Sequence, residues 1–147
     1  MQKNYLLQRN AKELYNEGLS LYNQGFVKEA FTLFKDMLVV YPEQKEHLDK
    51  EILDLLAQFK KADEIFKKGL DLLQHGNLKK ALNTVNKTLN IYPEYPEALS
   101  AKGSILSKLG KYNEALEVLN KALELKPDLN SAENSKDFVL RMLNGNK

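Results

Sequence analysis

Apolar residues recur at intervals of three and four along most of this chain, which is the spacing of one face of an α-helix. The pattern runs between Gly18 and Gly25 and again from Val27 to Val40. Similar pairs of runs follow in the second and third parts of the sequence. The periodicity therefore predicts an all-α chain.

Three stretches of the chain share one frame of small residues and proline, and internal repeats of this kind indicate a repeat architecture. The frame consists of Gly, Gly, Ala and Pro at fixed spacing. Its members are Gly18, Gly25, Ala30 and Pro42 in the first copy, Gly69, Gly76, Ala81 and Pro93 in the second, and Gly103, Gly110, Ala115 and Pro127 in the third. The step from the second copy to the third is 34 residues, whereas the step from the first to the second is 51.

Each part of the frame has a physical reason. The second glycine ends a periodic run, where a left-handed residue closes a helix without a Cβ clash. The proline follows the second run and stops it. The first glycine lies inside a helical run, where glycine costs about 1 kcal/mol relative to alanine. We expect this glycine to let another helix approach closely, with the alanine of the frame as its contact, so that each copy forms a helical hairpin.

These features resemble the tetratricopeptide repeat family. The period, the frame and the stretch "GKYNEALEVLNKALELKPD" from Gly110 to Asp128 carry the resemblance, which covers about residues 11–42 and 62–128. One departure is shared by all copies, because aliphatic residues replace the large aromatic that often opens the family's first helix. The resemblance implies a solenoid of three antiparallel hairpins.

Apolar stripes also predict helices at the two ends of the chain. After Pro127 a narrow apolar stripe, Ala132, Val139 and Met142–Leu143, predicts the capping helix that solenoids need to shield their last apolar face. At the other end, the apolar stripe of the first hairpin continues backwards, so we expect the first helix to start near Asn4.

The longer step between the first two copies adds 17 residues after Pro42. This segment has no proline, and no glycine before Gly69, while one apolar stripe runs through it. We expect a single helix over about residues 44–74, and the alternative is two helices with a kink near Lys60–Lys61, since sharp kinks usually need Pro, Gly or a bulge. The helix would join an N-terminal lobe, residues 1–59, to a C-terminal lobe, residues 60–147, although the two could count as one domain.

The first half of the long helix carries the apolar residues Leu48, Ile52, Leu55 and Phe59. We expect this stripe to be buried against the first hairpin. The alternative is a homodimer interface, because an exposed apolar stripe is a site for a partner.

By resemblance, the chain is a protein–protein interaction adaptor or scaffold that binds a peptide segment or a partner helix. The residues expected to face such a partner lie on the first helix of each hairpin. They are Tyr15, Asn16, Leu19, Tyr22 and Asn23 in the first copy, Phe66, Lys67, Leu70, Leu73 and Gln74 in the second, and Ser100, Ser104 and Lys108 in the third. The alternative from a different class is a structural module that self-assembles through the long-helix stripe or the solenoid ends.

One subclass of the family clamps the C-terminal carboxylate of chaperone tails with Lys, Asn and Arg. The first-repeat clamp positions are Tyr15 and Leu19 in this sequence, and the third repeat has Glu97 and Ala101 where the clamp needs cations. We therefore do not expect a chaperone-tail ligand.

The sequence lacks the residue patterns of metal sites, cofactor sites and catalytic sites. The sequence has no cysteine, and its two histidines, His47 and His75, have no second ligand at a metal-binding spacing. No phosphate-binding loop or nucleophile motif is present. We expect no enzyme activity, no metal and no cofactor.

Charge and hydropathy bear on nucleic-acid partners and on location. The net charge is +2, and paired lysines are typical of solvated helix faces, so we expect no nucleic-acid partner. The N-terminal stretch lacks the apolar run of a signal peptide, and no segment is long and apolar enough for a membrane span. We expect a cytoplasmic protein.

Overall fold

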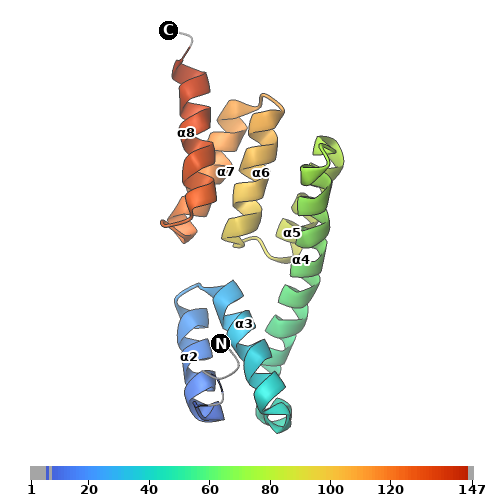
Figure 1. The fold of residues 1–147 in the computed structure, drawn as a ribbon, viewed down its shortest axis with the longest axis vertical. Coiled ribbons are helices and arrows are strands. Elements are labelled where there is room, and N and C mark those ends of the chain that lie inside the picture. Colours follow the sequence, from blue (N-terminus) through green and yellow to red (C-terminus); the bar gives the residue numbers. More distant parts are fainter. Residues whose placement is uncertain (1–5, 7, 146–147) are drawn as a thin grey trace. The chain divides into compact units, whose positions relative to one another are not determined.

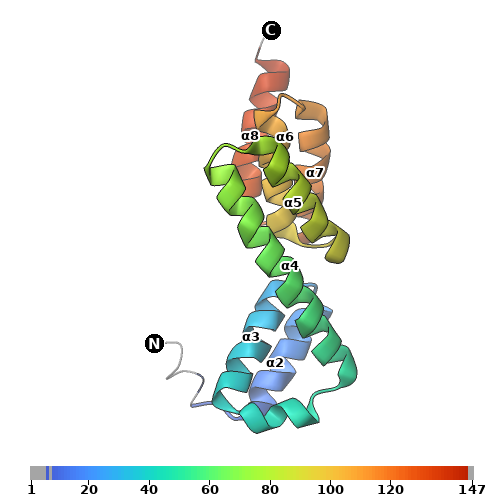
Figure 2. The same cartoon turned by 90° about the vertical axis from the view of Figure 1, so that its right-hand side faces the viewer.

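The computed structural model describes residue 6 and residues 8–145, and every regular element in that part of the chain is helical (Figures 1 and 2). The elements are α2 (Ala11–Asn23), α3 (Val27–Val40), the 3₁₀-helix η1 (Pro42–His47), α4 (Lys50–Gln74), α5 (Leu78–Ile91), α6 (Pro96–Lys108), α7 (Tyr112–Leu125) and α8 (Asn130–Asn144). The predicted all-α architecture of helical hairpins is confirmed. The chain divides into two compact units, one up to Phe59 and one from Lys60 on, which are described separately.

Each hairpin turns at a glycine in the left-handed region. Gly25, Gly76 and Gly110 have φ angles of 87°, 78° and 78°, and no other described residue apart from these three has a positive φ. An L-residue with a Cβ is strained there. The three predicted helix-closing glycines are therefore confirmed at the turns α2–α3, α4–α5 and α6–α7.

The glycines inside the first helices permit a close helix approach, as expected. A Cβ placed on Gly18 would lie 2.6 Å from Phe34 Cζ, one on Gly69 3.0 Å from Val85 Cγ2, and one on Gly103 2.5 Å from Leu119 Cδ2. The expected contact was wrong in its partner, because the side chain that fills the space stands four residues after the alanine of the frame. Alanine is small enough to bring the helices together, but a larger side chain one turn later reaches the glycine.

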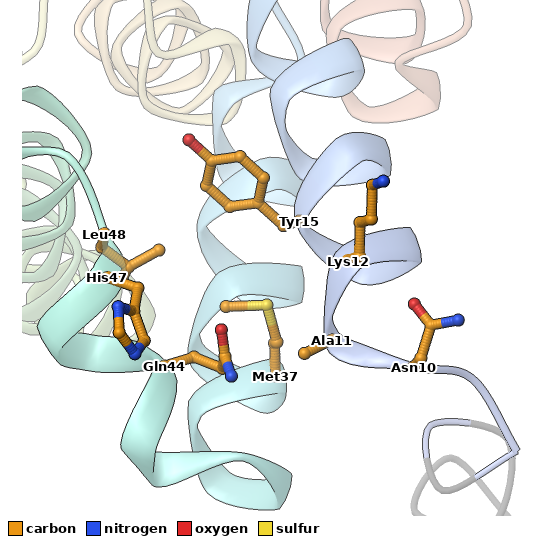
Figure 3. Close-up of a pocket in the computed structure, with 8 residues that line it drawn as sticks. All are labelled: Asn10, Ala11, Lys12, Tyr15, Met37, Gln44, His47 and Leu48. Carbon is orange, nitrogen blue, oxygen red and sulfur yellow. The ribbon is translucent and has the colours of Figure 1, made fainter.

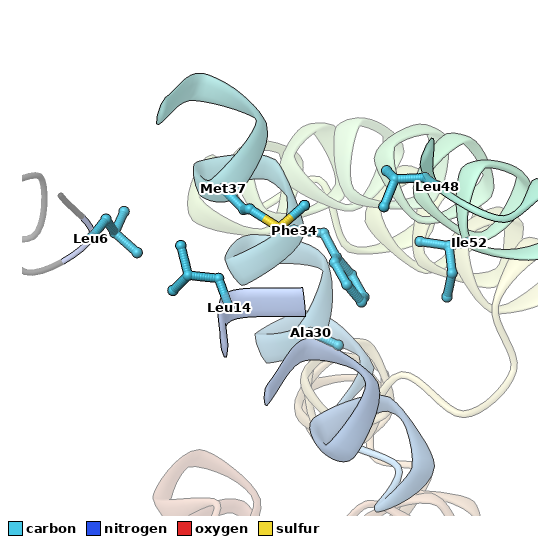
Figure 4. Close-up of a cluster of buried hydrophobic side chains, with 7 residues drawn as sticks. All are labelled: Leu6, Leu14, Ala30, Phe34, Met37, Leu48 and Ile52. Atoms are coloured by element: carbon cyan, nitrogen blue, oxygen red, sulfur yellow. The ribbon is translucent and has the colours of Figure 1, made fainter. Parts of the chain in front are cut away.

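The core of the N-terminal unit joins three helices (Figure 4). Leu14 of α2 and Phe34 and Met37 of α3 form a buried cluster with Leu48, which precedes the long helix, and Ile52 in its first turn. α3 and α4 also meet at a second point, where the rings of Phe31 and Phe59 lie 4.7 Å apart between centroids. The inserted segment thus contributes the third wall of this core.

The apolar stripe of the insertion is accordingly buried. Leu48, Ile52, Leu55 and Phe59 are each at most 8% exposed. Burial against the first hairpin, which was the first expectation, is what the core cluster shows for Leu48 and Ile52. The stripe is therefore not the exposed dimer surface that the alternative interpretation required.

The long helix begins later than predicted. Residues Pro42–His47 form the 3₁₀-helix η1, and Leu48 is extended, with φ −75° and ψ 137°, before α4 starts at Lys50. The extended conformation of Leu48 separates η1 from α4, and the Leu48 side chain is buried in the core of the N-terminal unit. From Lys50 to Gln74 the structure has one helix, α4, which passes through Lys60–Lys61 without ending there.

The first helix also begins later than predicted. Asn10 is the N-cap of α2, and its side chain accepts a hydrogen bond from the backbone N–H of Glu13 at 2.9 Å. This bond satisfies one of the free donors at a helix N-terminus and defines where the helix starts. The predicted start near Asn4 lies outside the described residues, and the helix does not extend back through Asn10.

The C-terminal unit has two layers, with α6 between α4 and α8 in one layer and α5 and α7 in the other (Figures 1 and 2). Its core includes Leu99 and Leu106 of α6 and Leu119 of α7. Ala132 and Val139 of α8 are completely buried in the same cluster, so α8 caps the last hairpin as predicted.

The glycine contacts predict unequal responses to alanine. Gly103→Ala should destabilise the protein by about 1–2 kcal/mol, because overpacking against Leu119 exceeds the gain of about 1 kcal/mol in helix propensity. Gly69→Ala should change stability by less than about 1 kcal/mol, since Val85 is further away. Urea unfolding of both variants measures the difference, and equal effects would contradict the packing argument.

Candidate functional site

The residues predicted to face a partner lie on α2 in the N-terminal unit and on α4 and α6 in the C-terminal unit. Several of them are exposed on these helices. The exposed members are Asn16, Tyr22, Asn23, Lys67, Leu70, Gln74 and Lys108, while Tyr15, Leu19, Leu73 and Ser104 are partly buried. Tyr22 and Leu70 stand out because they are large apolar or aromatic side chains with 39% and 41% exposure.

Two of the predicted residues are held in contacts inside the C-terminal unit. Phe66 is buried, and its ring lies 5.1 Å from that of Tyr95 between centroids. The hydroxyl of Tyr95 donates to Asp63 at 3.1 Å, which fixes the tyrosine against α4. Ser100 is also buried and shares a hydrogen bond of 2.8 Å with Ser131 of α8. Both residues are therefore part of the packing of the C-terminal unit and are not exposed to a partner.

Tyr15 connects α2 to the start of the long helix. Its hydroxyl donates to Asp49 at 3.1 Å, and its ring lies 6.0 Å from Phe34 between centroids. Burial raises the pKa of Tyr15 above its ordinary value of 10.0, and the hydrogen bond and negative charge of Asp49 act in the same direction. The neutral phenol is thus the form that the fold stabilises.

A cavity of about 560 Å³ lies in the N-terminal unit between α2, α3 and η1 (Figure 3). Its walls combine apolar surface with amide, phenol, imidazole and ammonium groups. The lining residues are Asn10, Ala11, Lys12, Tyr15, Met37, Gln44, His47 and Leu48. His47 is the last residue of η1 rather than part of the long helix, where it was expected.

The described residues contain no group of three or more His, Asp and Glu side chains placed to hold a metal ion. His75 lies at the end of α4, where its Nδ1 is 2.8 Å from the backbone oxygen of Asp71. Among the helices of the described part, none is both long and apolar enough to cross a membrane.

On α8 the prediction missed Phe138 and was wrong about Met142, which it placed in the covered stripe of the cap. Phe138 is 43% exposed and Met142 is 37% exposed, although this helix was expected only to cap the solenoid. The signal was available in the repeat period, because Phe138 stands 34 residues after Ser104 and 68 after Leu70. It was missed because the stripe that predicts the cap is its buried one, which includes Ala132 and Val139.

Comparisons with known proteins agree with the helical repeat. The family model described as "Tetratricopeptide repeat" matches residues 96–129, and the model described as "PPR repeat" matches residues 19–39. No curated protein matches the sequence.

Two solved structures share the fold. One is the C-terminal TPR-containing domain of a Plasmodium falciparum protein named as FK506-binding, with 22% identity, a TM-score of 0.58 and coverage of 97% of this chain and 93% of that one. Another is the TPR2B domain of yeast Sti1 in a pHsp70 complex, with 17% identity, a TM-score of 0.51 and coverage of 90% and 97%. At these identities the likeness is one of fold.

The Tyr15–Asp49 bond predicts a pH-dependent stability. Because folding raises the pKa of Tyr15, the folded state holds its proton more tightly, and this contribution is complete below pH 10 and lost as pH rises through the folded-state pKa. Tyr15→Phe should lower stability at neutral pH by at most about 1 kcal/mol, and the difference from wild type should shrink above about pH 10.

Denaturant unfolding at several pH values measures this difference. Tyr22→Phe is the matched control, because the Tyr22 hydroxyl makes no hydrogen bond with the described residues. A constant difference between wild type and Tyr15→Phe across this range would contradict the assignment.

The burial of Phe66 predicts a structural effect on substitution. Phe66→Ala should destabilise the protein by about 3–5 kcal/mol, because it leaves a cavity against Tyr95. Its neighbour Lys67 makes a surface ion pair with Asp63 at 3.0 Å, and Lys67→Ala should change stability by less than about 1 kcal/mol. Thermal or urea unfolding compares the two, and a neutral Phe66→Ala would show that this ring is not part of the core.

Proposed function

We propose that this chain, which matches the tetratricopeptide repeat model over residues 96–129, is a non-enzymatic adaptor that holds a peptide segment or a partner helix against the first helices of its hairpins. The partner is a protein, and each unit by itself offers exposed residues for it, on α2 in the N-terminal unit and on α4 and α6 in the C-terminal unit. A cytoplasmic location is part of the proposal.

The observation that carries this proposal is the exposure of Leu70. Along the C-terminal half of α4, Ala62 and Phe66 are buried, whereas Leu70 is 41% exposed between Lys67 and Gln74, which are also exposed. An apolar side chain with a polar border is typical of the centre of a protein interface. Tyr22 provides a similar feature on α2 of the N-terminal unit.

We do not propose a chaperone tail as the ligand. Where the clamp of that subclass needs cations, α6 has Ala101 and Glu97, and the carboxylate of Glu97 is 3.3 Å from Lys126 Nζ. Neither residue supplies a cation for a terminal carboxylate, and Lys126, which could, is paired with Glu97. The pHsp70 ligand belongs to the yeast domain, whose likeness to this chain is one of fold.

The test uses the full chain with a charge placed on the surface. Leu70→Asp should lower the affinity of a captured partner at least about tenfold, because a carboxylate replaces an apolar contact. Val39→Asp is the matched control, since Val39 is 66% exposed on α3 of the other unit. Tagged wild type and both variants are used for affinity capture, and each retained protein is then purified and titrated directly.

Circular dichroism checks that both variants remain folded. A partner that binds wild type and Leu70→Asp equally well would contradict a role for this surface. Light scattering tests the alternative of self-assembly, and an oligomer at working concentration with no captured partner would replace the adaptor proposal.

A further inference from the structure

The repeat period aligns three helices of the C-terminal unit, α4, α6 and α8, into one layer (Figure 1). Residues at intervals of 34 occupy equivalent places on these helices. One row is Leu70, Ser104 and Phe138, and the next, four residues further on, is Gln74, Lys108 and Met142. We refer to these six residues as the α8-side face.

Hydrogen bonds and ring contacts fix the sides of the helices that form this face. Ser131 of α8 bonds to Ser100 of α6, so that side of α8 is turned towards α6. Phe138 and Met142 follow Ser131 at seven and eleven residues, which is the spacing of one helical stripe. On α4, Phe66 contacts Tyr95 beside α6, and Leu70 lies one turn further along the same side.

The first row has a small side chain between two large apolar ones. Leu70 is 41% and Phe138 43% exposed, while the residue between them on α6 is the small Ser104. With Met142, three of the five exposed large hydrophobic residues in the described chain lie on this face. Exposed apolar side chains gathered in this way mark a binding surface.

The charge of the face is uneven. Two turns before the first row, Asp63 accepts from Tyr95 and pairs with Lys67, and Glu97 pairs with Lys126 through Oε1. At the other end of the face, Lys108 is exposed in the last turn of α6 and makes no ion pair with any residue that the structure describes. The Lys108 ammonium at this end is complementary to a carboxylate of a ligand.

We infer that the α8-side face binds a protein segment that carries a bulky apolar side chain followed closely by an acidic residue. The apolar side chain sits over Ser104 between Leu70 and Phe138, and the acidic residue meets Lys108. Four helical residues separate the two rows, which is about 6 Å, so the two ligand residues are about two apart in an extended segment or four apart in a helix. This inference rests on the proposed function and assigns α8 a wall of the site in addition to its role as cap.

A phage-displayed library of random peptides, selected on the full chain, tests the ligand chemistry. The expected result is enrichment of peptides with Leu, Phe or Met near Asp or Glu. Replacing the acidic residue of a selected peptide by its amide should weaken binding in fluorescence anisotropy. Enrichment that is indifferent to acidic residues, or an amide peptide that binds equally well, would overturn the inference.

Variants of the protein locate the site. Phe138→Ala and Leu70→Ala should each lower peptide affinity about tenfold, while Val39→Ala should not change it. Lys108→Glu should remove the preference for acidic peptides, whereas Lys80→Glu, the same charge change on α5 in the other layer, should retain it. An unchanged preference in Lys108→Glu would overturn the inference.

Other outcomes separate this inference from the proposed function. If captured partners depend on Leu70 but lack the apolar and acidic pair, the adaptor proposal stands and the ligand chemistry is wrong. If wild type forms a dimer that Phe138→Asp dissociates, the face is a contact between copies of this chain and the inference is overturned. Circular dichroism and urea unfolding confirm that each variant is folded.

Discussion

The structure depends on one contact that is repeated in every hairpin. A glycine in the first helix lies directly against a side chain of the second helix, in the pairs Gly18–Phe34, Gly69–Val85 and Gly103–Leu119. Because glycine has no Cβ, the two helices approach closely enough for the partner side chain to be completely buried. The contact fixes the rotation of each first helix, and this rotation decides which of its residues enter the core and which remain exposed. The exposed set that could meet a partner is therefore a consequence of how the glycine packs.

The long helix meets this constraint twice. Its first part supplies Ile52 and Phe59 to the core of the N-terminal unit, and its second part presents Gly69 to α5. Both requirements are met by one apolar stripe that continues through Lys60–Lys61, so no break is needed in the helix. The change of direction comes before it, at the extended residue Leu48. The 17 additional residues thus complete a three-helix core and remove an apolar surface that would otherwise be free for association.

The last helix shows how a cap can also provide a binding surface. Ala132 and Val139 close the apolar end of the last hairpin, while Phe138, next to Val139 in sequence, points to another side of the same helix. A cap with a fully polar outer side would serve stability alone. Phe138 and Met142 are exposed beside the small Ser104 and beside Lys108, which has no ion-pair partner among the residues that the structure describes. This combination gives the surface a specific chemical character, which is why we assign it a ligand of matching polarity.

Local features of the sequence determined much of this protein. The 3.6-residue periodicity, the left-handed glycines at the turns and the prolines after the second helices are properties of short segments, and they predicted the hairpins and the cap. Tertiary structure decided what depends on neighbours from distant segments. It determined that Phe34, Val85 and Leu119 fill the space at the glycines, that η1 and Leu48 precede the long helix, and that Phe66 and Ser100 are buried while Phe138 is exposed. A helical stripe shows which residues share a side, but only the packed neighbours determine which side is covered.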